Sequence, residues 1–173
     1  RFVSNLSAAD FQLLENNERQ TLDLVLQQRE PALFTLLVDS SQSMAIRADA
    51  VRTTAATLLK SLAPDDHVIV ASFSRTITSV TGPTTDRATV LGAIGAIRPR
   101  GGTAILDTLG EAASTLEGGD RRKAIILITD GYDQHSQSAF DAAGVAVRKR
   151  DITLDGLGLS REASISLKGG KRL

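Results

Sequence analysis

The segment that most constrains the fold is Leu33–Asp39, a mostly apolar stretch that ends in an acidic residue. Because its apolar character is nearly continuous, it is typical of a central parallel strand that is covered on both faces. A polar turn follows at once at Ser40–Ser43, and a segment with helical spacing comes directly after it. Open α/β sheets bind ligands outside the carboxyl ends of such strands, so this turn is the first candidate site.

The chain downstream repeats this alternation of buried strands and helices. Apolar runs predict strands over 67–73, 124–129 and 152–157, and helical spacing predicts helices over 46–62, 87–97, 106–116 and 139–149. In the last helix we expect Phe140, Ala143 and Val147 to face inward. The β-branched, alternating segment 76–81 predicts an edge strand. Together these elements predict an α/β fold with a doubly wound, mostly parallel sheet and right-handed crossovers.

The N-terminal part of the chain follows a different pattern. Two short alternating segments, 10–15 and 20–27, flank a polar stretch that contains Asn16 and Asn17. Asn tolerates a left-handed backbone, so this stretch predicts a β-hairpin, with a frayed linker as the alternative. Pro31 ends the segment.

We therefore expect an N-terminal β-hairpin extension over 1–30 and a main domain over 31–173. The segment 160–173 has no clear period, and the first residue is Arg1 rather than Met. Both observations indicate a processed protein or a domain cut from a longer chain, with a main domain that is shortened at its C-terminal end.

The composition excludes several classes of function. The chain has 20 Lys and Arg against 20 Asp and Glu, so its net charge exerts no general attraction on nucleic acid or anionic membranes. It has no Cys, which excludes disulfides, zinc–thiolate sites and cysteine nucleophiles. No apolar run approaches the 18 or so residues that a membrane-spanning helix requires, so we expect no membrane insertion.

Three loops carry the candidate chemistry, and each lies at the end of a strand or the start of a helix. They are the turn after the first buried strand, the Gly101-Gly102-Thr103 turn, and the Thr129-Asp130-Gly131 turn. In a doubly wound sheet these loops converge on one crevice. They bring together two carboxylates and three hydroxyls, which belong to Asp39, Ser41, Ser43, Thr103 and Asp130.

A ligand set made only of oxygen atoms suits a hard divalent cation. With only two carboxylates, the set favours Mg²⁺, which keeps several of its waters, over Ca²⁺, which prefers more carboxylates. Such a cation can accept one further oxygen from outside, and an acidic side chain of another protein is the natural donor. The structural alternative is that Asp39 and Ser41 end a strand while Ser43 and Thr103 cap helices.

Other sites are less well supported by the sequence. There is no Gly-x-Ser-x-Gly motif, no phosphate-binding loop with its Lys and no Gly-x-Gly-x-x-Gly motif. His135 is expected to be a solvated loop residue and His67 a structural one. The basic run 121–123 is too short for a nucleic-acid patch, and Asp133 is expected at the surface.

In the five candidate ligands and their order, the chain resembles a von Willebrand factor A domain. The metal-ion-dependent adhesion site of that family has the pattern Asp-x-Ser-x-Ser, then a distant Thr and a distant Asp, which all five residues above match. The resemblance spans about residues 32–159 and implies a Rossmann-like sheet in which 76–81 is an antiparallel edge strand. It also implies that the serines bind metal directly, the aspartates largely through water, and the Thr directly once an acidic ligand arrives.

Two departures from the family pattern stand out. Gln42 occupies a position where Gly is common, and no convincing final helix follows the last strand. A weaker resemblance links the hairpin and the domain together to bacterial von Willebrand factor A-related proteins, many of them exported. It implies an extracytoplasmic protein that is periplasmic, on the cell surface or secreted. A cytoplasmic location is the alternative.

The leading hypothesis is a non-catalytic module that coordinates Mg²⁺, with Mn²⁺ or Ca²⁺ as alternatives. It binds a partner protein that donates a Glu or Asp carboxylate to the metal, and it binds no nucleic acid. The alternative hypothesis is a metal-dependent hydrolase that acts on phosphate esters. A third is a structural part of an exported assembly whose metal site is vestigial.

Overall fold

The computed structural model describes residues 6–22, 30–116 and 121–159. The chain divides into two compact units, Arg1–Glu30 and Pro31–Leu173. Within the described residues, no helix combines the length and the apolar character that a membrane crossing requires.

The first unit contains a short antiparallel hairpin. After the 3-10 helix η1 (Ala8–Asp10), strand β1 (Leu13–Glu15) pairs with β2 (Glu18–Gln20). Asn16 and Asn17 have φ angles of 51° and 68°, the left-handed values that a two-residue hairpin turn requires. The predicted hairpin is therefore confirmed.

The predicted limits of its strands are wrong. The tight turn lets pairing begin at Glu18, so β2 runs over three residues from there and ends at Gln20, where the second strand was expected to begin. The first strand is likewise shorter than the predicted 10–15. Residues 23–27 of the expected second strand lie outside the described part of the chain.

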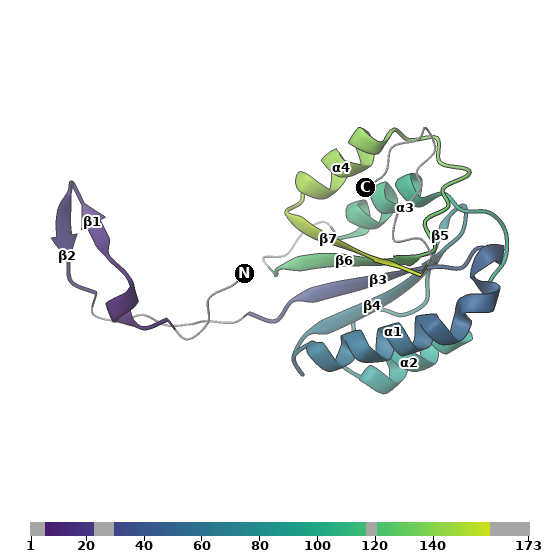
Figure 1. Ribbon diagram of the computed structural model, residues 1–173, viewed down its shortest axis with the longest axis horizontal. Coiled ribbons are helices and arrows are strands. Elements are labelled where there is room, and N and C mark those ends of the chain that lie inside the picture. The colour runs from purple at the N-terminus through teal and green to yellow at the C-terminus, as the bar shows by residue number, and fades with distance from the viewer. Residues whose placement is uncertain (1–5, 23–29, 117–120, 160–173) are drawn as a thin grey trace. The chain divides into compact units, whose positions relative to one another are not determined.

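The second unit is built around a five-stranded sheet with the order β5-β4-β3-β6-β7 (Figure 1). Its strands are β3 (Leu33–Asp39), β4 (His67–Phe73), β5 (Ile77–Ser79), β6 (Lys123–Thr129) and β7 (Ile152–Gly158). The central strand β3 is parallel to β4 and β6, and β6 is parallel to β7. The edge strand β5 is antiparallel to β4. The predicted fold class and the antiparallel edge are confirmed.

Two pairs of helices cover the two faces of this sheet. Helices α1 (Ala48–Ser61) and α2 (Arg87–Ala96) lie on one face, and α3 (Ile105–Thr115) and α4 (Phe140–Arg148) lie on the other (Figure 1). Consecutive residues of β3 point to opposite faces, so Leu36 packs in the apolar cluster under α1 and α2 and Leu37 in the one under α3 and α4. Both side chains are fully buried. This double cover is why the strand is apolar along most of its length.

Two details of the predicted helices are wrong. The helix expected from Ile46 begins at Ala48, because the residues before it form the 3-10 helix η2 (Gln42–Arg47). Phe140 is 39% exposed, whereas Ala143 and Val147 are buried as expected. Phe140 is the first residue of α4, and the apolar cluster that holds the other two side chains does not extend to it.

The parallel strands place three loops at one edge of the sheet. The carboxyl ends of β3 and β6 lie side by side, with Val38 paired to Ile128 one residue before the ends. The loop after β3, the loop after β6 and the turn that precedes α3 therefore meet at this edge. The segment 160–173, for which no final helix was expected, lies outside the described residues.

Candidate metal centre

Asp39 is the last residue of β3, and its side chain is fixed by two hydrogen bonds. Its Oδ1 accepts from the backbone N–H of Ser41 at 2.8 Å, and its Oδ2 accepts from the hydroxyl of Thr129 at 2.6 Å. Asp39 is only 2% exposed. Burial raises the pKa of this carboxyl, the nearby charge of Asp130 adds to the rise, and the bonds from Thr129 and Ser41 oppose it.

The hydroxyls of Ser41 and Ser43 lie together, with their Oγ atoms 3.1 Å apart. Ser41 is 2% exposed and Ser43 is exposed, so the pair runs from the protein interior to the surface. Ser43 does not cap a helix, because it lies inside η2, which begins at Gln42. The capping alternative is therefore wrong for Ser43, and its hydroxyl remains available to a ligand.

The second loop is attached to the first through backbone hydrogen bonds. The N–H of Gln42 donates to the carbonyl of Gly101 at 3.0 Å, and the N–H of Arg100 donates to the carbonyl of Ser40 at 2.6 Å. The turn at Gly101 has a φ of 77°, a left-handed conformation in which glycine is free of strain. These bonds hold the loop that carries Thr103 against the end of β3.

Thr103 is 2% exposed and connects the second loop to the third. Its carbonyl accepts from the N–H groups of Gln134 and His135 at 3.0 and 2.9 Å. Helix α3 starts at Ile105 after Ala104, so Thr103 does not cap it and the capping alternative is wrong here too. The hydroxyl of Ser136 takes that role instead, because it accepts from the N–H of Leu106 at 2.9 Å.

Asp130 follows β6, and its carboxylate is buried with a relative side-chain exposure of 1%. Neither of its oxygens has a hydrogen-bond partner among the described residues. The guanidinium of Arg47 faces this carboxylate, with its Nη1 3.4 Å from Oδ2. Even with Arg47 beside it, the carboxylate accepts no hydrogen bond from the described residues, which is costly for a buried charge, so the chemistry of this position fits a bound metal ion.

Three further residues belong to this region, although none of them was predicted as a ligand from the sequence. Thr129, which was predicted at the strand end and in the third loop but not as a ligand, orients Asp39 and also accepts from the N–H of Gly131 at 3.0 Å. Arg47 was not singled out at all. Asp133 was expected at the surface but is 6% exposed, because its Oδ1 accepts from the N–H of Ser136 and draws it into the loop.

His135 is not the solvated loop residue that was expected. Its ring is half-buried against Gly102, where an added Cβ atom would lie 2.2 Å from Cε1 of the ring. Its Nε2 lies 3.0 Å from Nη2 of Arg75. The absence of a side chain at Gly102 therefore lets the ring pack directly beside the backbone that precedes Thr103.

The five candidate ligands thus lie on three loops that are hydrogen-bonded to one another. Among the described residues, no group of three or more His, Cys, Asp or Glu could hold a metal ion. This set differs from such a group because it contains two carboxylates and three hydroxyls. Its low charge makes it a weak site for the protein alone and leaves room for an external oxygen ligand.

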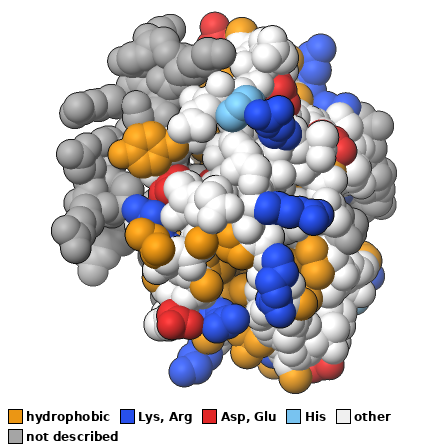
Figure 2. Space-filling model, turned by 90° about the vertical axis from the view of Figure 1, so that its right-hand side faces the viewer, with side chains coloured by type: hydrophobic (Ala, Val, Ile, Leu, Met, Phe, Trp, Pro, Cys, Tyr) orange, Lys and Arg blue, Asp and Glu red, His pale blue; other side chains and the backbone are white. Residues whose placement is uncertain are grey.

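The surface around these loops is basic. Figure 2 looks onto the side of the domain at which β3 and β6 end, and it shows several Lys and Arg side chains there among apolar side chains, with a smaller number of acidic side chains. Five arginines adjoin the loops through contacts or shared cavities: Arg47, Arg52, Arg75, Arg98 and Arg100. A face of this charge favours an acidic ligand.

Structural comparison places the chain among known folds. It is similar to the BatB protein of Bacteroides thetaiotaomicron, with 24% identity, a TM-score of 0.64, and coverage of 82% of this chain and 75% of that one. An aerotolerance-related membrane protein of Bacteroides fragilis gives 21% identity, a TM-score of 0.66, and coverage of 82% and 80%. The pilus adhesin SpaC of Lactobacillus rhamnosus GG gives 29% identity, a TM-score of 0.52, and coverage of 62% and 15%.

Sequence comparison assigns the family. No curated protein is significantly similar to the chain. The family model of the von Willebrand factor type A domain, however, matches residues 34–132, which is more than half of the chain and contains all five candidate ligands. The chain belongs to the von Willebrand factor type A domain family.

Proposed function

We propose that this chain is a non-catalytic protein-binding module that holds a divalent cation and uses it to bind an acidic side chain of a partner protein. The observation that carries the proposal is the carboxylate of Asp130, which is buried with both oxygens unbonded among the described residues. The proposed ligands are Asp39, Ser41, Ser43, Thr103 and Asp130. Mg²⁺ is the proposed ion, because two carboxylates and three neutral hydroxyls suit a cation that retains water.

Each proposed ligand is prepared for this role by its surroundings. Asp39 is held by Thr129 and by the N–H of Ser41, so it is positioned before any ion binds. Ser43 is exposed and lies beside the Ser41 hydroxyl, which gives the site an open side. The bound ion would supply a positive centre that attracts a carboxylate oxygen of the partner, and the surrounding arginines favour the same charge.

The relatives support a partner protein and an extracytoplasmic setting. One similar structure is that of a pilus adhesin, and another is that of an aerotolerance-related membrane protein. We therefore propose that the domain acts outside the cytoplasm, in the periplasm, on the cell surface or after secretion. We also propose that residues 31–173 form the binding domain and residues 1–30 a separate hairpin extension.

Calorimetric titration with Mg²⁺ tests the metal site. We expect the wild-type chain to bind one ion, and Ser41→Ala and Thr103→Val each to weaken binding at least about tenfold. Ser114→Ala is the matched control, because the hydroxyl of Ser114 only donates to the carbonyl of Gly110 on the exposed side of α3. Unchanged affinity in both site variants would contradict the proposed ligand set.

A pull-down from a native cell-envelope extract tests partner binding. The immobilised chain should retain its partner in Mg²⁺ and lose it in EDTA or after Asp39→Ala, with circular dichroism showing that the variant remains folded. The captured protein should then lose binding when one of its own Glu or Asp residues is replaced by its amide. Retention of the partner in EDTA and by Asp39→Ala would refute the metal-mediated mechanism.

The hydrolase hypothesis gains no observation of its own. The Ser41 hydroxyl contacts Ser43 and the His135 ring contacts Arg75, so neither contact assigns a base to a serine nucleophile. In the metal-dependent alternative a water on the ion would be the nucleophile instead. Turnover of a phosphate ester by the chain in Mg²⁺, lost on Asp130→Ala, would overturn the non-catalytic proposal.

A further inference from the structure

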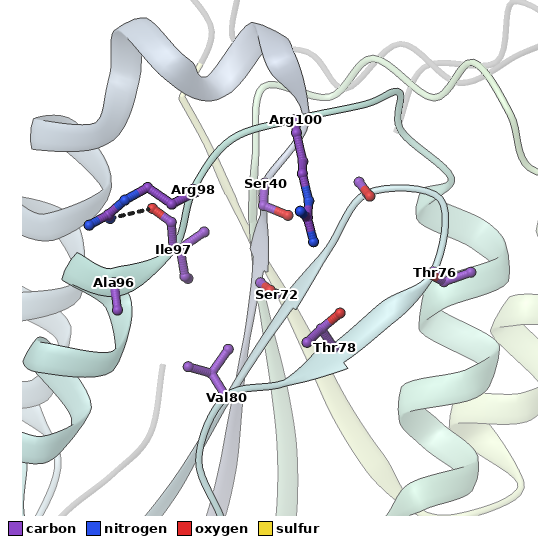
Figure 3. Close-up of a pocket in the computed structure, with 10 residues that line it drawn as sticks. Ser40, Ser72, Thr76, Thr78, Val80, Ala96, Ile97, Arg98 and Arg100 are labelled. Atoms are coloured by element: carbon purple, nitrogen blue, oxygen red, sulfur yellow. Dashed lines mark hydrogen bonds between the residues drawn. The ribbon is translucent and has the colours of Figure 1, made fainter.

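A second site adjoins the metal centre. A cavity of about 310 Å³ lies between the β4–β5 hairpin and the loop that follows α2 (Figure 3). Its lining includes five hydroxyl side chains and two arginines, and it includes no acidic residue. Ser40 belongs to this lining and stands in the chain between two proposed metal ligands, Asp39 and Ser41, so the cavity and the metal centre share a wall.

Arg100 supplies the free charge of this cavity. In Figure 3 its side chain extends from the loop into the space bounded by Ser40, Ser72 and Thr78. Its backbone N–H donates to the carbonyl of Ser40 at 2.6 Å, which fixes the base of the side chain. Among the described residues, the guanidinium itself has no hydrogen-bond or ion-pair partner, and neither do the hydroxyls of Ser72 and Thr78.

Arg98 differs from Arg100, although both line the cavity. Its Nη1 donates to the carbonyls of Gly95 and Ile97 at 2.9 and 3.2 Å, so its guanidinium is held at the carboxyl-terminal end of α2, where the helix dipole favours a positive charge. In Figure 3 it points away from the centre of the cavity. One unengaged guanidinium therefore remains, together with unpaired hydroxyls that can donate hydrogen bonds.

We propose that this cavity binds a second carboxylate of the same partner segment that donates the first one to the metal centre. A guanidinium forms two parallel hydrogen bonds with a carboxylate, and the hydroxyls of Ser72 and Thr78 can donate to its remaining lone pairs. Of the two lining arginines, only Arg100 points its guanidinium into the cavity, and its one charge matches one carboxylate, whereas a phosphate dianion would bring two charges to it. The inference rests on the proposed function, and it specifies the partner as a segment with two acidic side chains.

The test uses the full 173-residue chain, labelled with ¹⁵N, and a capped hexaglutamate peptide. In EDTA, where the metal centre cannot contribute, the peptide should shift the amide signals of Ser72, Thr78 and Arg100 in a saturable way. Arg100→Gln should raise the dissociation constant at least fivefold. Arg121→Gln is the matched control, because Arg121 is exposed in the loop before β6, at the opposite end of the strand, and should leave the constant unchanged.

A second arm separates this inference from the proposed function. Adding Mg²⁺ should tighten peptide binding in the wild type and in Arg100→Gln, and it should have no effect in Asp130→Asn. If Mg²⁺ does not tighten peptide binding but the binding still depends on Arg100, the proposed function is wrong and the carboxylate site in the cavity is supported. If the gain is present but Arg100→Gln and Thr78→Val bind the peptide as the wild type does, the cavity proposal is wrong. Shifts with inorganic phosphate but not with hexaglutamate would also overturn it, in favour of a phosphate ligand.

Discussion

Nη1 of Arg47 lies 3.4 Å from Oδ2 of Asp130, so a positive charge of the protein itself faces a buried carboxylate of the candidate metal centre. The same Nη1 donates to the carbonyl of Ser43 at 2.8 Å, and Nε donates to the carbonyl of Leu159 at 3.0 Å. One guanidinium thus joins the first loop, the third loop and the segment after β7. It balances part of the charge that a metal ion would otherwise balance alone.

Arg47 is therefore expected to compete with the cation. Replacing it by Gln removes the charge and keeps a donor that can reach one of the two carbonyls. We expect Arg47→Gln to tighten Mg²⁺ binding about fivefold, which corresponds to the roughly 1 kcal/mol that a partly exposed charge pair contributes. Calorimetric titration measures the change. Weaker binding would show instead that Arg47 serves mainly to position the carbonyl of Ser43 and its loop.

Asp130→Asn should separate metal binding from folding. Without metal the buried carboxylate costs stability, so in EDTA we expect the variant to melt about 2–4 °C above the wild type, the shift that about 1 kcal/mol produces in a domain of this size. The rise in melting temperature that Mg²⁺ gives the wild type should be absent from the variant.

Asp155→Asn is the control for this experiment, because it removes the same charge from an exposed position of β7. It should leave both the melting temperature in EDTA and the gain from Mg²⁺ unchanged. A variant at Asp130 that melts well below the wild type in EDTA would show that Arg47 already compensates the carboxylate.

The sequence predicted an element correctly where its pattern of apolar residues matches the burial of those residues in the structure. The run from Leu33 predicts its strand because both faces of β3 are covered, and the strand predicted over 67–73 has the limits that β4 shows. The hairpin was predicted from two asparagines but with wrong limits, because periodicity alone does not fix where pairing begins. Phe140 shows that helical spacing indicates which side of a helix faces the core, but not how far the core extends along the helix.

Only part of the candidate site was predictable, because local pattern does not encode contacts between residues that are far apart in the chain. The five proposed ligands follow strand ends or precede helices, so local pattern pointed to them. Arg47 contacts Asp130, which lies 83 positions later in the chain. Thr129 contacts Asp39, which lies 90 positions earlier. Ser136 caps α3 from a distance of 30 positions. No local pattern encodes such contacts, which depend on how the three loops pack.

The packing of His135 on Gly102 gives a test of that loop arrangement. A Cβ atom at position 102 would overlap the ring, so Gly102→Ala should destabilise the chain by about 1–3 kcal/mol and weaken Mg²⁺ binding through the adjacent Thr103. Urea unfolding in EDTA measures the first effect and calorimetry the second. In the double variant with His135→Ala the overlap is gone, and most of both losses should be restored. Equal losses with and without the ring would mean that the contact is not their cause.

Asp107 provides the last prediction, on the dependence of stability on pH. Hydrogen bonds from the Ser138 hydroxyl and from the N–H of Gln137 hold the pKa of Asp107 below its ordinary value of 3.8. A carboxyl with a lowered pKa in the folded state stabilises that state above the ordinary pKa, and this stabilisation is lost as the pH falls through the lowered value. Asp107 also accepts from the backbone N–H of Ser138 at 2.8 Å. Together with the bond from the N–H of Gln137 at 2.9 Å, this attaches the third loop to α3.

We therefore expect Asp107→Asn to be less stable than the wild type at neutral pH, by less than about 1 kcal/mol because the carboxylate is solvated. The difference should persist down to pH 4 or so and should disappear below the lowered pKa, where the wild-type carboxyl is protonated and loses the same stabilisation. Urea unfolding of both proteins at several pH values measures it. A difference that stays constant into strong acid would show that the substitution acts through packing rather than through the charge of Asp107.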